Sequence, residues 1–525
     1  MLPFDSLIYG KIHNKQVYSK GEIVNTDKLP RLYEENDSVE QELLKKFRNL
    51  DALFLDTAPQ FRSYEHQMQE LADIESQYSE LIKPTPRPKR RDPPTHDEMN
   101  GPKLSTDAVI RLGGERFIQS FSSSTKDVST LSHPYGTSFS GLSDQQVQDV
   151  QLIENLLLCA EKVSQQQFER SIKLLEWCDV LSSNSGNPIQ RLVYYFSKTL
   201  REKVEGENGR ILTRGSGKSH VEDIEGRIMT PNPATLAVYQ NLPFFQAATF
   251  SGVQALVDGV IGSKKVHIID LSIRQGLQST ILMQALASQP NCPIEHLKIT
   301  AIGTRFKQKI EQTGDRLKSF AESINLSFSF NAVVVKDMLE FNKDLLELDQ
   351  DEALGVYSCN GLWTMIAQQD RLECLMNVIK STNPRVMVVG ETAANLNSPN
   401  FVNRFIEALF FYGAFFDSLE DCMGREDENR ALVESVYLGQ GIRSIVGTEG
   451  VERAFRHVNI DVWRKFFARF GMEEVELSMS ALYQANLMVE KLCNGGSCTL
   501  DMDGNSLVIG WKGTPIQCLS AWKFE

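Results

Sequence analysis

One apolar run that ends in an aspartate constrains the fold of this chain more than any other feature, and it reads Val266-His267-Ile268-Ile269-Asp270-Leu271. It lacks the alternation of a half-exposed strand, so it predicts a strand that is buried on both faces. A polar turn follows at 272–276, and 277–287 has the spacing of a helix. The stretch therefore predicts the first strand–helix unit of a parallel sheet.

Four more short runs of β-branched residues follow this unit. Each is separated from the next by a segment long enough for a helix, which is the length that parallel strands need between them. The spacing therefore predicts an α/β fold with a doubly wound, mostly parallel sheet rather than a β-sandwich. The four runs are 297–303, 328–335, 353–358 and 385–391.

The C-terminal part is predicted to alternate helices and strands. Residues 461–470 and 480–492 have helical spacing, and 475–477 is expected to be extended. Ser506–Trp511 is expected to close the sheet, because an antiparallel final strand is common in large α/β folds.

Length and charge limit the classes of protein that this chain can belong to. Its 525 residues exceed what one core usually holds, so at least two structural regions are expected. A formal net charge of -13 repels phosphate, so any contact with DNA needs a local basic patch.

The start lacks the features of a signal peptide, and no later stretch is long enough to span a bilayer. The nine cysteines lack paired spacings. We therefore expect a soluble intracellular protein with reduced thiols.

Residues 1–145 form a polar leader that is expected to be largely disordered, with short helices and no independent domain. Ser38–Gln41 resembles a capping box ahead of an apolar segment at 43–54, and 108–121 is a second short apolar segment. An isolated helix of this length is marginal. Each segment is therefore interpreted either as a helix that folds on a partner or as one that docks on the main domain.

A basic run lies between these two segments, at 83–91, where three prolines favour an extended backbone. An extended basic peptide suits the acidic grooves of import receptors, and it is equally typical of a solvated linker. The candidate nuclear-import residues are Lys89, Arg90 and Arg91.

From Ser143 onward, apolar residues recur at helical spacing and predict a helical cap over 146–262 that leads directly to an α/β core over 263–525. Leu156, Leu157 and Leu175 are candidates for helical packing or for partner docking. Within this part Gly215–Ser219 resembles the end of a phosphate-binding loop. However, the required earlier glycine is Leu212 and no strand precedes it, so a mobile loop is favoured.

A helix beginning near Ser398 carries more aromatic side chains than one amphipathic stripe requires. Core packing accounts for most of them. Aromatic residues are also favoured at protein interfaces, so Phe410 and Phe411 are further candidates for partner docking.

The signals of cofactor chemistry are incomplete. A nucleotide site needs a glycine-rich first turn and a carboxylate after the second strand, but only Gly276 follows the first strand and the second ends at Thr304-Arg305. Asp270 either orients a ligand hydroxyl or caps the adjoining turn, and His267 is more typical of a core histidine than of a catalytic one. Because no metal-ligand set and no nucleophile elbow occur either, no cofactor, metal or catalytic residue is expected.

Six sequence elements resemble the motifs of the plant GRAS transcriptional regulators and occur in the same order along the chain. The strand residues Val266, His267, Ile268, Ile269 and Asp270 match the VHIID motif of that family. The two leucine-rich regions correspond to 152–181 and 313–348, and the PFYRE region to 401–420. Glu452 and Arg453 stand in an RVER-like element, and the SAW motif is represented by Trp511, Ser520, Ala521 and Trp522. The resemblance runs from residue 146 to the end.

Departures from the family pattern bear on the subfamily. Ser279 replaces a tryptophan that usually follows the VHIID strand. The body is DELLA-like, but the leader contains neither a DELLA nor a VHYNP stretch, so gibberellin-triggered degradation through those motifs is not supported. Residues 110–118 and the C-terminal body resemble the branch associated with arbuscule development in symbiosis.

The resemblance implies a nuclear transcriptional regulator or co-regulator that is not an enzyme. It implies contacts with other GRAS proteins and with DNA-binding transcription factors, homo- or heterodimers, indirect contact with DNA and no membrane. The sheet and its helical cap also resemble Class I methyltransferases, so an enzyme or small-molecule binder that uses the Rossmann-like core is the competing class. The missing glycine fingerprint and second-strand carboxylate weigh against cofactor use.

Overall fold

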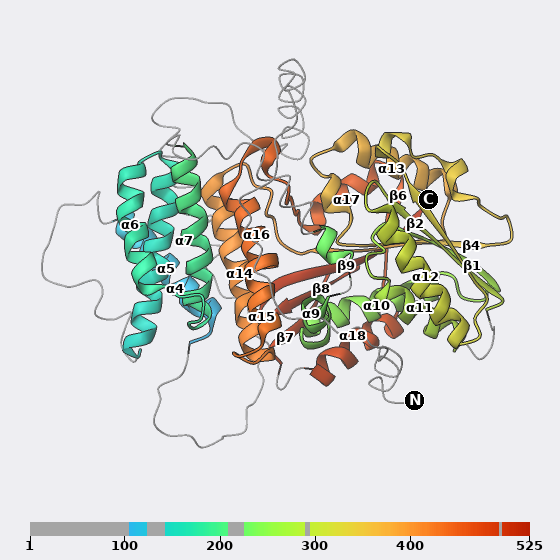
Figure 1. Ribbon diagram of the computed structural model, residues 1–525, viewed down its shortest axis with the longest axis horizontal. Coiled ribbons are helices and arrows are strands. Elements are labelled where there is room, and N and C mark those ends of the chain that lie inside the picture. The colour runs from blue at the N-terminus through green and yellow to red at the C-terminus, as the bar shows by residue number, and fades with distance from the viewer. Residues whose placement is uncertain (1–103, 123–141, 208–224, 231, 289–293, 493–495) are drawn as a thin grey trace, which may run out of the picture. The chain divides into compact units, whose positions relative to one another are not determined.

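The structure, a computed structural model, describes residues 104–122, 142–207, 225–230, 232–288, 294–492 and 496–525, all in one compact unit of the chain (Figure 1). Some sequence predictions fall outside these residues: the helix at 43–54, the basic run at 83–91 and the loop at 215–219.

Helices make up most of the described chain. Those that precede the first strand are α4 (Thr106–Ser122), α5 (Asp144–Ser164), α6 (Phe168–Leu181), α7 (Pro188–Glu207), α9 (Pro233–Asn241) and α10 (Pro243–Gly259). Those that follow it are α11 (Leu277–Ala287), α12 (Lys307–Ser323), α13 (Gln369–Thr382), α14 (Phe401–Cys422), α15 (Glu428–Leu432), α16 (Gly439–Ile442), α17 (Ile460–Ala468) and α18 (Met479–Leu492). Single turns of 3-10 helix occur at η2 (Met338–Glu340), η3 (Lys343–Leu346), η4 (Leu362–Met365) and η7 (Gly450–Glu452), and π-helical turns at η5 (Val433–Leu438) and η6 (Arg443–Gly447).

The strands form one mixed sheet in the order β3-β2-β1-β4-β5-β9-β8-β7, with β6 paired to β9. The first five are parallel, and the pairings that involve β6, β7, β8 and β9 are antiparallel. The bounds are β1 (Lys265–Asp270), β2 (His296–Gly303), β3 (Phe328–Val334), β4 (Ala353–Cys359), β5 (Val386–Thr392), β6 (Met472–Val475), β7 (Cys498–Asp503), β8 (Ser506–Trp511) and β9 (Thr514–Phe524). The prediction of a doubly wound, mostly parallel sheet is confirmed.

Both faces of the sheet are covered, which explains the continuous apolar runs in its strands. One face packs against α10, α11, α12 and α18, and the other against α13 and α17 (Figure 1). Side chains of β1 divide between the two cores, because successive residues of a strand point to opposite faces. Val266 and Ile268 belong to the core on the face covered by α10, and Ile269 belongs to the core on the face covered by α13.

A helical layer lies beside the sheet and contains more than the segment that precedes β1. Helices α5, α6 and α7 pack on one another, and α14 packs on α5 and α7 although it follows the fifth strand (Figure 1). Helix α4, from the leader, packs on α5 and α14. The expected cap over 146–262 is therefore completed by helices from both sides of it in the sequence.

Local capping determines where several of these helices begin. Ser143 and Gln146 form a capping box, with the amide of Gln146 3.3 Å from Ser143 Oγ and the amide of Ser143 2.9 Å from Gln146 Oε1. Asn400 Oδ1 accepts hydrogen bonds from the amides of Val402 and Asn403 at the start of α14. These side chains satisfy amide groups that lack intrahelical partners.

The C-terminal part differs from the prediction. Ser506–Trp511 is a strand, but it does not close the sheet, because β9 follows it and pairs with β5, β6 and β8. The extended segment expected at 475–477 lies instead at β6. Trp522 lies on β9, the strand that follows Ser506–Trp511. The meander β7-β8-β9 buries the end of the chain against the parallel strands.

Candidate functional site

The sheet order changes direction between β1 and β4, which is the point where doubly wound folds usually bind ligands. Asp270 ends β1, and its carboxylate accepts hydrogen bonds from the amide of Ser272 at 2.8 Å and from Gln278 Nε2 at 3.2 Å. Ser272 Oγ in turn accepts a hydrogen bond of 2.8 Å from the amide of Cys359, the last residue of β4. Asp270 therefore caps the turn that follows its strand, one of the two roles considered for it.

An arginine crosses this switch point from one strand end to the other. Arg274 donates a hydrogen bond of 2.7 Å from its guanidinium to the carbonyl of Asn360, which follows β4. Both residues have positive φ, 46° at Arg274 and 49° at Asn360, a conformation that is uncommon for residues other than glycine. Such strain persists only where the surrounding contacts hold it. The link connects the loops after β1 and β4 directly.

Two buried carboxyl groups flank this link. Burial raises the pKa of Asp270 to about 6, against hydrogen bonds from Ser272 and Gln278 that lower it. Burial likewise raises the pKa of Glu391, on β5, to about 7. Glu391 Oε1 accepts hydrogen bonds from the amides of Gly361 at 3.1 Å and Leu362 at 2.9 Å. The polar groups at the strand ends thus bond to one another and to the adjoining loops.

His267, in the middle of the VHIID strand, is fully buried. Its Nε2 lies 2.8 Å from Thr300 Oγ1 on β2, and its Nδ1 lies 3.2 Å from Glu352 Oε2. Burial, with added repulsion from Lys298, lowers the pKa of His267 to about 3. Although the carboxylate of Glu352 is near, burial has the larger effect on the pKa of His267, so the imidazole ring stays neutral. A buried threonine and a neutral histidine without solvent access form a polar contact between strands rather than a reactive pair.

The tryptophans of the SAW motif are buried and hydrogen-bonded. Trp511 Nε1 donates to Asp417 Oδ2 at 2.7 Å, which joins β8 to α14. Trp522 Nε1 donates to Ser520 Oγ at 2.8 Å, and its ring lies 4.8 Å from that of Phe467 on α17. Ala521 is buried beside them on β9. The motif fixes the meander to the helices on both faces of the sheet.

The RVER-like element fastens the loop that follows β5. Arg453 and Arg456 both donate to Asn397 Oδ1, at 3.2 and 3.1 Å, and Arg404 donates to the carbonyl of Ser398 at 2.6 Å. All three arginines are buried. Glu452 lies in the single turn η7, where its amide donates to the carbonyl of Glu449. These contacts hold two loops together.

The residues predicted to dock partners lie mostly inside the fold. Leu156, Leu157 and Leu175 are buried within the helical layer, and Phe411 is buried on α14. Phe410 is partly buried, and the guanidinium of Arg111 lies 5.1 Å from its ring centroid. The leucines therefore support helical packing, the other role considered for them, and a partner reaches them only if the helices move.

The outer face of α6 carries two large apolar side chains that sequence reasoning missed. Trp177 is 63% exposed and Val180 is 79% exposed. They lie three residues apart, so they are neighbours on the helix surface. The sequence carries one signal that could have identified them. Both residues fall outside the apolar stripe of the helix, which contains Ile172 and Leu175.

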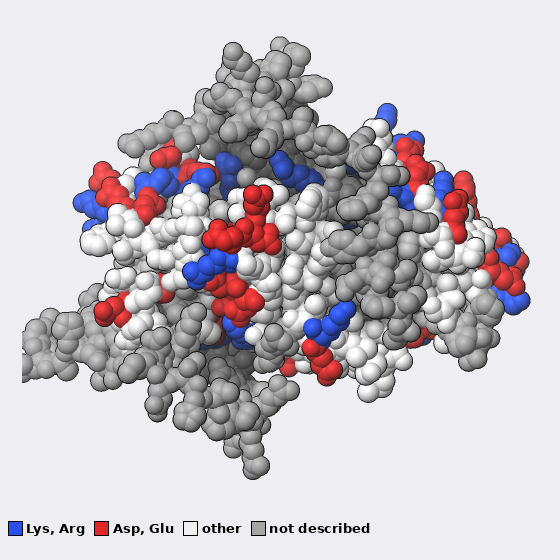
Figure 2. Space-filling model, turned by 60° about the horizontal axis from the view of Figure 1, so that its bottom comes forward, with Lys and Arg blue, Asp and Glu red and all other residues white. Residues whose placement is uncertain are grey.

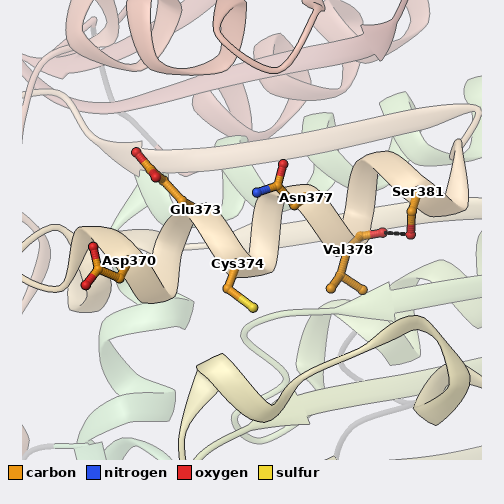
Figure 3. Close-up of a pocket in the computed structure, with 6 residues that line it drawn as sticks. All are labelled: Asp370, Glu373, Cys374, Asn377, Val378 and Ser381. Carbon is orange, nitrogen blue, oxygen red and sulfur yellow. Dashed lines mark hydrogen bonds between the residues drawn. The ribbon is translucent and has the colours of Figure 1, made fainter.

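An open pocket of about 490 Å³ lies along α13, lined by Asp370, Glu373, Cys374, Asn377, Val378 and Ser381 (Figure 3). Glu373 forms an ion pair of 2.6 Å with Arg469, and Ser381 Oγ donates to the carbonyl of Val378 at 2.7 Å. Burial raises the pKa of the Cys374 thiol, which disfavours the thiolate form. These groups do not form a catalytic arrangement.

Charged side chains on the face drawn in Figure 2 lie in small groups of mixed sign among the described residues. Within the described part of the chain, no cluster of three or more histidine, cysteine or acidic residues could hold a metal ion. In the same residues no helix is both long and apolar enough to cross a membrane.

The family model of the GRAS domain family matches residues 152–523. The chain belongs to the GRAS family. The DELLA protein RGL3 of Arabidopsis thaliana is 30% identical over 376 residues, which cover 71% of this chain and 69% of that protein. The DELLA protein GAI1 of Vitis vinifera is 29% identical over 386 residues, or 73% of this chain. The match spans 63% of the length of that Vitis protein, less than two thirds.

The crystal structure of SCL7 from Oryza sativa shares the fold of this GRAS chain. Its TM-score is 0.60 at 24% sequence identity, over 71% of this chain and 99% of that one. In this fold VHIID forms β1, the RVER-like element joins two loops, and the SAW residues lie on β8 and β9 of the antiparallel meander. In the described residues the side chains of VHIID, the RVER-like element and SAW support the fold, whereas the exposed Trp177 and Val180 lie on α6, in the segment that resembles the first leucine-rich region.

Proposed function

We propose that this GRAS protein is a nuclear transcriptional regulator or co-regulator that acts by binding other proteins through the outer face of α6. The observation that carries the proposal is the exposure of Trp177 and Val180 side by side on a well-packed helix. Tryptophan is among the residues most enriched at the centres of protein interfaces. Other GRAS proteins and DNA-binding transcription factors are the proposed partners, and the resulting assemblies are proposed to be homo- or heterodimers.

The chemistry of this face suits a protein partner. Lys173 and Glu176 are exposed beside the two apolar residues, so charged side chains flank a small apolar centre, as at the edge of many interfaces. The opposite side of α6 is anchored by buried Leu175 and Cys178, which hold the helix on the bundle. A face presented on a rigid helix needs little reordering when it binds.

The contacts at the switch point support a scaffold role for the sheet rather than catalysis. Arg274 bonds to the carbonyl of Asn360, and the carboxylate of Asp270 is used by Ser272 and Gln278. The polar groups that a cofactor would use are therefore engaged within the chain. DNA contact is proposed to be indirect, through partner proteins.

A reporter assay tests this function. A Trp177→Ala, Val180→Ala variant is expected to lose most of its effect on transcription, whichever its sign, while its thermal unfolding stays close to that of the wild type. Met479→Ala is the matched control, because Met479 is 80% exposed on a different helix, α18. Unchanged transcriptional activity of the α6 variant at equal protein level would rule out this face as the docking site.

A small-molecule binder that uses the switch point is the competing class, which the GRAS family match and the engaged polar groups there do not favour. Calorimetric titration of the full chain with S-adenosylmethionine and its demethylated product tests it. Saturable micromolar binding that is lost in Asp270→Asn would establish ligand binding at the switch point. Absence of heat, with no thermal stabilisation, would leave the sheet as a scaffold.

A further inference from the structure

Helix α4 lies outside the residues that match the GRAS family, yet it fills a groove between α5 and α14. Its inward side chains, among them Val109, Ile110 and Phe117, are buried. The guanidinium of Arg111 covers the ring of Phe410. The groove therefore contains one of the aromatic residues that the sequence suggested for partner docking.

Two glycines shape the contact so that helices approach closely. A Cβ atom on Gly113 of α4 would lie 2.5 Å from Ile153 Cγ2 on α5. A Cβ atom on Gly413 of α14 would lie 2.6 Å from Ile110 Cδ1. Each glycine thus receives a branched side chain from the facing helix, which gives the groove a defined shape.

The same helix is a poor helix former by itself. Gly113 and Gly114 lie in its middle, and a glycine in a helix interior costs about 1 kcal/mol relative to alanine. Isolated helices of this length are marginal even with good formers. The helical state of α4 therefore depends on the groove.

The polar contacts of α4 are such that its dissociation from the groove leaves no buried charged group without a partner. Thr106 Oγ1 donates to Asp417 Oδ1 at 2.5 Å, but Asp417 also bonds to Trp511 at 2.7 Å and to Lys512 at 2.6 Å. The ion pair between Arg116 and Glu154, at 2.7 Å, has side chains that are 11% and 12% exposed, and departure of α4 would open both of them to water. Residues 123–143 join α4 to α5, and that length of chain reaches up to roughly 70 Å when extended.

We propose that the groove between α5 and α14 is a docking site for an amphipathic helix, that α4 occupies it in cis, and that a partner helix takes its place. The partner helix carries a small residue against Ile153, a branched aliphatic residue against Gly413 and a cation over Phe410. Because α4 is tethered, a partner competes against a high effective concentration. The groove is distinct from the exposed face of α6.

A labelled peptide of residues 104–122 tests the proposal. It is titrated against the full-length wild type and against a full-length Ile110→Asp variant, in which the tethered helix is weakened. The peptide is expected to bind the variant at least about tenfold more tightly, because the wild-type groove is filled. A peptide with Glu115→Gln, at an exposed position of α4, should bind as well as the unchanged peptide, and one with Ile110→Asp should not bind. Equal affinity for the wild type and the variant would overturn the proposal.

Hydrogen exchange of the unmodified chain gives a second measurement that needs no variant. Amides of Gly113–Phe117 are expected to exchange at least about tenfold faster than those of Ile153–Leu157 on α5, because α4 opens separately. Equal protection of the two segments would show that α4 leaves only when the whole domain unfolds, and would overturn the proposal.

Discussion

Asp417 on α14 accepts a hydrogen bond of 2.7 Å from the indole nitrogen of Trp511 on β8. The same carboxylate receives the hydroxyl of Thr106 from α4 and the ammonium of Lys512. One buried group thus connects a helix of the leader, the aromatic helix and the C-terminal meander. This contact gives the first tryptophan of the SAW motif a physical role in joining the helical layer to the sheet.

Replacing Asp417 by alanine is expected to lower the free energy of unfolding by about 1–3 kcal/mol, because the buried indole N–H of Trp511 loses its acceptor. Urea denaturation measures the change. Asp421→Ala is the matched control, since Asp421 pairs with the same Lys512 but its side chain is 42% exposed, and its loss should cost less than about 1 kcal/mol. Equal losses in the two variants would contradict this role for Asp417.

A buried ion network joins α7 to the helices that follow α14. Arg191 Nε and Arg430 Nε each lie 3.1 Å from Glu434 Oε1, and all three residues are buried. Glu434→Ala would leave buried guanidinium groups without this carboxylate, so a loss of about 3–5 kcal/mol is expected in denaturant unfolding. Arg425→Ala provides the comparison, because Arg425 is largely exposed and pairs with Glu420 at the edge of the network. A loss below about 1 kcal/mol for Glu434→Ala would show that the network does not hold these helices.

The two buried carboxyl groups at the switch point predict a pH dependence. Their pKa values are raised by burial to about 6 at Asp270 and about 7 at Glu391, so the folded chain holds these protons more tightly than the unfolded chain. Their contribution to stability is therefore present at low pH and is lost as pH rises from about 4 to about 7. Urea midpoints at pH 5 and pH 8 should show that the wild type loses more stability on this rise than an Asp270→Asn, Glu391→Gln variant. Parallel pH profiles for the two proteins would refute the assignment.

The parallel part of the sheet could be predicted closely from sequence, because strands buried on both faces carry unbroken apolar runs such as Val386–Val389. The pairings of the antiparallel meander β7-β8-β9 could not be predicted from sequence. Strand β9 mixes apolar residues with Gln517 and Ser520, and its pairings with β5, β6 and β8 depend on partners far away in the chain. The predicted antiparallel strand at Ser506–Trp511 is confirmed, but the prediction that it closes the sheet is wrong, because β9 follows it.

The helical layer could be predicted from the periodicity of apolar residues. The periodicity did not show which other helices pack against each buried face. The spacing of Leu156 and Leu175 predicted buried faces correctly. It could not show that α4 and α14 cover the remaining sides of α5, because those contacts join distant segments. The position of Trp177 and Val180 outside the apolar stripe of α6 was the sequence signal for its exposed face, but it could not show that no other described helix covers them.

The basic run of the leader is either a nuclear-import signal or a solvated linker, and a localisation assay distinguishes the two. Replacing Lys89, Arg90 and Arg91 by alanine should reduce the nuclear fraction of a fluorescently tagged full chain, because import receptors bind extended basic peptides through acidic grooves. Alanine at Lys45 and Lys46, a basic pair elsewhere in the leader, should leave the distribution unchanged. Undiminished nuclear accumulation of the triple variant would exclude this run as the import signal.

Direct measurement of partner affinity tests the central claim that this GRAS domain acts by docking proteins on α6. The full chain, its Trp177→Ala, Val180→Ala variant and the Met479→Ala control are each titrated with a purified GRAS or transcription-factor partner. The α6 variant should bind at least about tenfold more weakly with an unchanged unfolding midpoint, because interface tryptophans often contribute about 2 kcal/mol or more. Equal affinity of all three proteins would contradict the claim.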